Sequence, residues 1–160
     1  MTNIDCGAFA DCFHLTHVRI PGNVKKIKNR AFWFCNDLTD IVIPNGVKTI
    51  GESAFAHCAR LTSVTISNSV TTIEASAFRF CAGLTAVALP NNIKDIKEYT
   101  FCGCASLKDI KIPDGVKTIG ESAFDCCVGL TNIEIPDSVE QIGRDAFAGC
   151  PGLFDAKSFG

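Results

Sequence analysis

Cysteine is the residue type in this sequence with the widest chemistry, because a thiolate can form a disulfide, bind a metal or act as a nucleophile. The chain of 160 residues contains ten cysteines. A cysteine at a fixed position of a repeat is typical of a small buried hydrophobic side chain. Seven of the ten recur every 23 residues and are therefore predicted to be core residues: Cys12, Cys35, Cys58, Cys81, Cys104, Cys127 and Cys150.

The three cysteines outside this series are Cys6, Cys102 and Cys126. The last two lie beside Cys104 and Cys127, so four thiols can gather in two neighbouring repeats. A zinc site or a local disulfide is an alternative there, but Cys-x-Cys and Cys-Cys lack the Cys-x₂₋₄-Cys spacing of structural zinc sites. We predict no metal site and no cofactor, and the redox state of these four thiols stays open.

Histidines offer little support for catalysis. The chain has three, His14, His17 and His57, and the last precedes Cys58. A cysteine that points into a core cannot reach a substrate, so a Cys-His enzyme is not favoured. No G-x-S-x-G, P-loop or G-x-G-x-x-G motif is present. The sequence therefore predicts a protein without catalytic residues that is not an enzyme.

Composition excludes further classes of function. Hydrophobic residues make up 47% of the chain and charged residues 20%, which is unlike a disordered segment. The net charge is −2 and basic residues are interleaved with acids, so we expect no nucleic-acid partner. No apolar run approaches the roughly 18 to 20 residues of a membrane span, and residues 1–21 do not read as a signal peptide. We therefore expect no membrane insertion.

The elements that position these residues are set by an internal repeat. A period of 23 residues without insertions fits one coil of a solenoid, in which each repeated apolar position forms a ladder through one continuous core. The clearest series are phenylalanine and leucine: Phe9, Phe32, Phe55, Phe78, Phe101, Phe124 and Phe147, and Leu15, Leu38, Leu61, Leu84, Leu107, Leu130 and Leu153.

Within each coil, Leu-x-x-Val-x-Ile alternates as a half-buried strand does, and the Pro that follows ends it. Val-x-x-Ile can form a second short extended stretch. Ser-Ala-Phe-x-x-Cys-x-x-Leu has apolar residues three apart, which indicates a helical or 3₁₀ turn. The predicted fold class is an α/β repeat solenoid of about seven coils. A parallel β-sheet lies on one face and short helical or 3₁₀ turns on the other.

The pattern I-P-x-x-V-x-x-I-x-x-x-A-F-x-x-C-x-x-L-x-x-I resembles the BspA-like leucine-rich repeats of cell-surface and secreted proteins from bacteria and some protists. It runs from residue 4 to about 154. The resemblance implies a right-handed solenoid that attaches to other proteins and does not catalyse reactions. The sequence departs from the family by having no signal peptide or wall anchor, by Ser67 in place of a strand-ending Pro, and by Thr100 in place of an Ala.

The outward side of the main strands is the predicted binding surface, because extended sheets are where solenoids bind. Its centre is small and uncharged and its ends are charged, as in an interface with a polar rim. It has no large aromatic residue, so each contact is expected to be weak and to depend on avidity. A neutral sheet that binds nothing stays an alternative. The predicted ligand-binding residues are His17, Arg19, Asp40, Val42, Ser63, Thr65, Ala86, Ala88, Asp109, Lys111, Asn132 and Glu134.

We predict a single solenoid domain over residues 1–160, with regular repeats at 4–154 and a degenerate end at 155–160. Neither end reads as a capping repeat, which suggests a piece of a longer array or end-to-end self-association. The predicted function is that of a non-enzymatic protein-binding module in a cell-surface or secreted adhesion protein. The alternative is an intracellular structural or interaction scaffold with no host ligand, for which a cytoplasmic location remains open.

Overall fold

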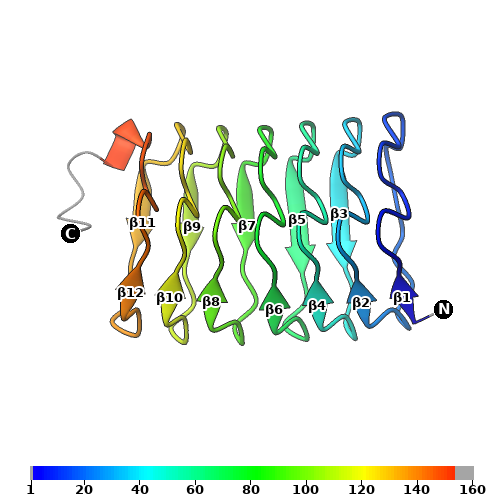
Figure 1. Ribbon diagram of the computed structural model, residues 1–160, viewed down its shortest axis with the longest axis horizontal. Coiled ribbons are helices and arrows are strands. Elements are labelled where there is room, and N and C mark those ends of the chain that lie inside the picture. Colours follow the sequence, from blue (N-terminus) through cyan, green and yellow to red (C-terminus); the bar gives the residue numbers. More distant parts are fainter. Residues whose placement is uncertain (1, 154–160) are drawn as a thin grey trace.

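Each period of 23 residues forms one coil, and the coils stack along a single axis (Figure 1). The computed structural model describes residues 2–153, so the predicted degenerate end at 155–160 lies outside the described residues. Six periods separate the first strand from the last. The solenoid with 23-residue coils and parallel sheets is confirmed.

Five long strands form one parallel sheet in the order β11-β9-β7-β5-β3. Neighbouring strands pair in a register of one period, for example Ile41 with Val64. The alternation of buried and exposed residues in β3 and β5 matches the predicted half-buried strand. The five strands are β3 (Asp40–Ile43), β5 (Ser63–Ile66), β7 (Ala86–Ala88), β9 (Asp109–Lys111) and β11 (Asn132–Glu134).

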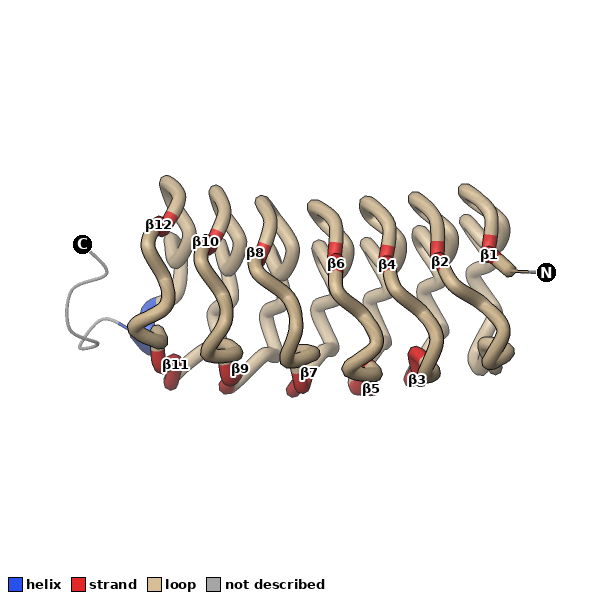
Figure 2. Tube along the Cα trace, turned by 90° about the horizontal axis from the view of Figure 1, so that it is seen from below, coloured by secondary structure: helices blue, strands red, loops and turns tan. Residues whose placement is uncertain are grey.

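Seven strands of two residues each run along another side of the coils (Figure 2). They come from the Val-x-x-Ile stretch, whose isoleucine is buried in every coil but the last, where Ile142 is 41% exposed. They form two parallel sheets, one of four strands and one of three. The first contains β1 (Asn3–Ile4), β2 (Lys26–Ile27), β4 (Thr49–Ile50) and β6 (Thr72–Ile73); the second contains β8 (Asp95–Ile96), β10 (Thr118–Ile119) and β12 (Gln141–Ile142).

The core is built from the repeated ladders. Consecutive phenylalanine rings stack with centroids 5.1 to 5.7 Å apart and planes within 13° of parallel. The cysteine ladder lies beside them, and each thiol from Cys35 onward donates a hydrogen bond to a phenylalanine carbonyl of the preceding coil, as Cys81 does to Phe55 at 3.1 Å. The thiol is small enough for the core, and it gives a second donor to a carbonyl that already accepts a backbone amide of its own coil, as Phe55 O does from Cys58 N at 3.3 Å.

The stretch predicted as a helical or 3₁₀ turn is instead a succession of tight turns, which corrects the α/β part of the fold class. Every second amide bonds within the coil, as Ala56 N does to Ser53 O at 3.2 Å. The amides between bond to the next coil, as Phe55 N does to Ala77 O at 2.8 Å. A helix would need all of these amides for itself. In residues 2–153 the one helix is a 3₁₀ turn at Pro151–Leu153.

The two departures from the repeat pattern are accommodated by hydrogen bonds. Ser67 has an amide that a proline would lack, and it donates to Ile43 O at 3.2 Å. Thr100 is buried, and its hydroxyl donates to Lys97 O at 2.7 Å. Each polar substitution therefore keeps the coil geometry without leaving a buried polar group unsatisfied.

Candidate functional site

The long-strand face consists of the outward residues of the five-stranded sheet and its continuation in the first coil. All twelve residues predicted for this face are exposed. Ten lie on the long strands, whereas His17 and Arg19 lie in a segment without strand pairing. The structure thus brings the predicted residues together on one surface. Whether that surface binds a ligand stays a prediction.

Strand register arranges the face in rows that cross the sheet. One row runs through Val42, Thr65, Ala88, Lys111 and Glu134, each residue opposite the next. Neighbours in such a row are about 4.7 to 4.9 Å apart in the direction of strand pairing. The row begins with Val42, of which 55% is exposed, and ends with opposite charges. The row therefore changes from apolar at Val42 to charged at Lys111 and Glu134.

A parallel row begins with a polar contact. His17 Nδ1 lies 3.4 Å from Asp40 Oδ1, and Thr39 donates to the same carboxylate oxygen at 3.1 Å. Beside it, threonine hydroxyls donate to carbonyls of the preceding coil, as Thr62 does to Thr39 O at 3.1 Å and Thr85 does to Thr62 O at 3.2 Å. These hydroxyl donors are used internally, so this edge of the face is rigid.

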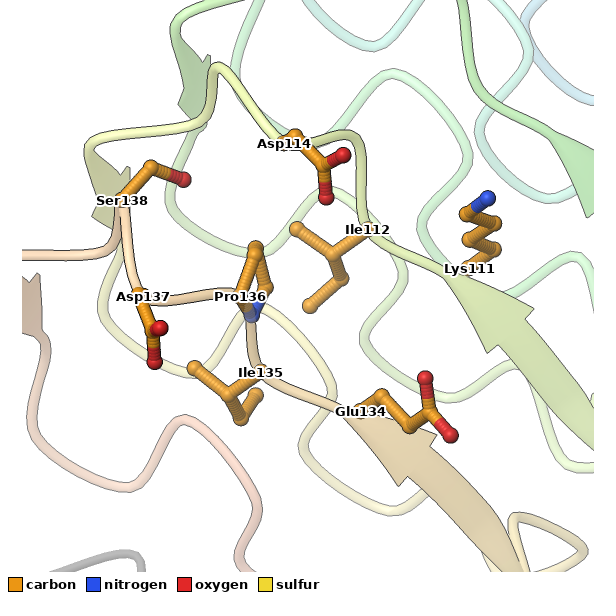
Figure 3. Close-up of a pocket in the computed structure, with 8 residues that line it drawn as sticks. All are labelled: Lys111, Ile112, Asp114, Glu134, Ile135, Pro136, Asp137 and Ser138. Atoms are coloured by element: carbon orange, nitrogen blue, oxygen red, sulfur yellow. The ribbon is translucent and has the colours of Figure 1, made fainter.

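A hollow of about 430 Å³ opens where β9 and β11 end, and the sequence reasoning did not find it (Figure 3). Lys111 and Glu134 belong both to this hollow and to the long-strand face. Asp114 and Asp137 make it acidic, and the hydroxyl of Ser138 is buried without a hydrogen-bond partner in the described residues. Its lining residues are Lys111, Ile112, Asp114, Glu134, Ile135, Pro136, Asp137 and Ser138.

The cysteines are all free thiols. Cys102 is buried and Cys126 is exposed, and burial raises the pKa of Cys102 while a hydrogen bond to Asp125 raises the pKa of Cys126. No group of three or more His, Cys, Asp or Glu side chains within residues 2–153 is placed to hold a metal ion.

The thiol of Cys58 is unsuited to nucleophilic catalysis. It is fully buried and donates to Phe32 O at 3.2 Å, and burial raises its pKa far above the ordinary thiol value. Burial also lowers the pKa of the neighbouring His57. A protonated buried thiol beside a histidine that does not contact it lacks the arrangement of an activated nucleophile.

Among the described residues, no helix has the length and apolar character needed to cross a membrane.

Comparison with known proteins gives a family and several similar structures. The family described as the BspA type leucine rich repeat region matches residues 2–93 and 26–154, in six copies of its repeat. None of the curated proteins compared with the chain matches it.

A leucine-rich repeat protein from Bacteroides ovatus is 31% identical, with a TM-score of 0.68, over 93% of this chain and 45% of that one. A leucine rich cell surface protein from Faecalibacterium prausnitzii is 28% identical, with a TM-score of 0.71, over 95% of this chain and 56% of that one. A leucine-rich repeat protein from Eubacterium ventriosum is 25% identical, with a TM-score of 0.83, over 93% of this chain and 40% of that one. The chain spans about half the length of the first two structures.

Proposed function

Because this chain belongs to the BspA-type leucine-rich repeat family, we propose that it is a non-enzymatic protein-binding module and that the long-strand face is its binding surface. Two features support this role. The repeated thiols are used in the core, and the repeat keeps a broad exposed sheet in register. Extended sheets of stacked repeats are general binding surfaces of solenoids.

The composition of the long-strand face is the observation that carries the proposal. Val42, Thr65 and Ala88 follow one another across three strands and are all exposed, yet none is charged. Surfaces of monomeric domains are rich in charge, and the core of an interface is depleted of it. Lys111 and Glu134 then bound the neutral region and lead into the hollow beside it.

A place in a cell-surface or secreted adhesion protein is the finer part of the proposal. It is supported by the similarity to the Faecalibacterium prausnitzii structure, which is described as a cell surface protein. Small side chains at the centre of the face make each contact weak, so adhesion would rely on several coils or several modules engaging at once.

A second candidate is an intracellular scaffold, which the ten free thiols favour. Disulfides persist in oxidising compartments, whereas cytosolic thiols stay reduced. The exposed thiols of Cys6 and Cys126 would be open to oxidation outside the cell.

The test is a pull-down with purified reduced protein against extracts of host-cell surfaces and of cytosol. The face variant carries Val42→Glu, Thr65→Lys and Ala88→Glu, which change exposed residues only. A matched control carries Asn45→Glu, Thr71→Lys and Asn92→Glu, exposed residues with the same net change in charge that lie off the long strands.

A partner retained by the wild type and the control but lost by the folded face variant supports binding through this surface. The extract that supplied the partner decides between adhesion and scaffolding. Retention of the partner by all three proteins, or of no partner by the wild type, contradicts the proposed surface.

A further inference from the structure

Aromatic and arginine side chains gather on the turns that lead from the short strands to the long strands in four successive coils. The chain's single tryptophan and single tyrosine are both among them. These residues occupy three positions of the repeat that in the other coils hold glycine, alanine, serine, cysteine or aspartate. We call them the aromatic–arginine patch: Arg30, Trp33, Phe34, His57, Arg79, Phe80 and Tyr99.

Ring contacts make the patch continuous across coils. Phe34 and His57 stack with centroids 4.2 Å apart and planes 5° from parallel, and the centroid of Phe80 lies 5.0 Å from that of His57. Trp33 meets Phe34 edge to face at 4.4 Å. Burial, followed by the nearby Arg79 charge, lowers the pKa of His57, which favours the neutral ring. The rings therefore form one ordered surface and not separate exposed side chains.

The backbone beneath these rings takes a conformation that bulky residues seldom adopt. Phe34, His57 and Phe80 have φ of 58°, 63° and 57°. Glycine occupies the same register at Gly103, where a side-chain carbon would overlap the Phe80 ring. The same conformation recurs at this position in the other coils, for example at Asp11 and Cys126, so it belongs to the geometry of the coil. The coil therefore fixes the backbone from which these rings project.

The two arginines lie over the rings. Arg79 Cζ is 4.9 Å from the ring centroids of both Phe80 and Tyr99, and Arg30 Cζ is 5.6 Å from that of Trp33. Neither makes an ion pair with any acid in residues 2–153. Arg79 Nε is buried without a hydrogen-bond partner in that range. Burial raises the pKa of Cys102 beside Arg79, which favours its neutral thiol.

We propose that the aromatic–arginine patch is a second docking surface and that its occupant is a protein segment carrying carboxylate side chains next to aromatic or apolar ones. A guanidinium that lies over rings and has no acid as a partner can bind a carboxylate in a bidentate pair. Trp, Tyr and Arg dominate the binding energy of protein interfaces. A sulfated polysaccharide would need a row of cations, whereas here the two cations are separated by rings.

The test measures binding to an immobilised random copolymer of glutamate and tyrosine by surface plasmon resonance. Polyglutamate and heparin serve as comparison probes. The variant combines Arg79→Gln with Phe80→Asn, because asparagine tolerates positive φ. A matched control combines Arg60→Gln with Phe13→Asn, an arginine paired with Asp37 and an exposed phenylalanine, both outside the patch.

We expect the wild type to bind the copolymer more tightly than it binds polyglutamate. The patch variant should bind the copolymer at least about tenfold more weakly than the wild type does, and the affinity of the control should stay within about twofold of the wild type. The long-strand face variant should bind as the wild type does, which separates the two surfaces. Arg30→Gln, a change at an exposed position, replaces the double variant if the latter fails to fold.

Three results would overturn the proposal. They are no binding of the copolymer by the wild type, an equal loss in patch variant and control, and tighter binding of heparin than of the copolymer.

Discussion

Replacing Phe78 by alanine should remove the central support of the core. The side chain is fully buried, and its ring stacks on Phe55 at 5.5 Å and on Phe101 at 5.7 Å. Truncating a buried phenylalanine costs about 3–5 kcal/mol, through lost transfer energy and the cavity left behind. Backbone pairing fixes the spacing of the coils, so neighbouring rings cannot close the gap. We therefore expect the upper part of that range, about 4–5 kcal/mol.

Phe9→Ala is the matched comparison, because Phe9 has the same place in the first coil but only one ring neighbour, Phe32, and is 38% exposed. Its truncation should cost about 2 kcal/mol, since less area returns to water and the site opens to solvent instead of leaving a cavity. The difference between the two variants isolates the value of the second stack and of full burial.

The assay is urea unfolding followed by circular dichroism, with the free energy of unfolding and the denaturant slope fitted for both variants. An unchanged slope shows that the variants lose stability without a change in the surface exposed on unfolding. A cost below about 2 kcal/mol for Phe78→Ala, or a cost no greater than that of Phe9→Ala, would refute the reasoning that the stacked rings carry the core.

Further predictions concern the thiols and one glycine. Ellman's reagent should label Cys6 and Cys126 readily in the native protein and the six buried ladder thiols, from Cys35 onward, only after unfolding. A time course with and without denaturant would show this. Burial raises the pKa of Cys35 to about 11. The contribution of this thiol to the free energy of unfolding is therefore complete below the unfolded thiol's pKa near 9 and is lost as the pH rises toward 11. Urea midpoints that do not change from pH 8 to 11 would contradict this. Gly51→Ala should lower the free energy of unfolding by about 1–3 kcal/mol, because the new Cβ would lie 2.6 Å from backbone atoms of the preceding coil. Gly22 has open space around it, so Gly22→Ala should change the stability measured in thermal melts by no more than about 0.5 kcal/mol.

Much of the fold follows from the sequence because burial constrains residue type at every inward position. Ile41 and Val64 are one period apart, and the structure pairs them directly. The twelve outward residues could be assigned in the same way, since alternation along a strand fixes which side chains leave the core. Their exposure is confirmed, and their role in binding remains a prediction.

The turns between short and long strands were harder to predict. Apolar residues three apart suit a helical turn and a succession of tight turns equally well. The outcome depends on whether an amide such as that of Phe55 bonds within its own coil or to the next one. That choice is made by the stacking of coils, which no single repeat encodes.

The sequence by itself determined the period, the inward ladders and the outward face, because a strict repeat places equivalent residues in contact whatever the details of the coil. Only the tertiary structure decided where unlike residues meet. The acidic hollow needs the ends of two strands, and the aromatic–arginine patch joins Trp33 to Tyr99 across four coils. Residues far apart in the chain become neighbours there because stacking converts a separation of one period into about 5 Å.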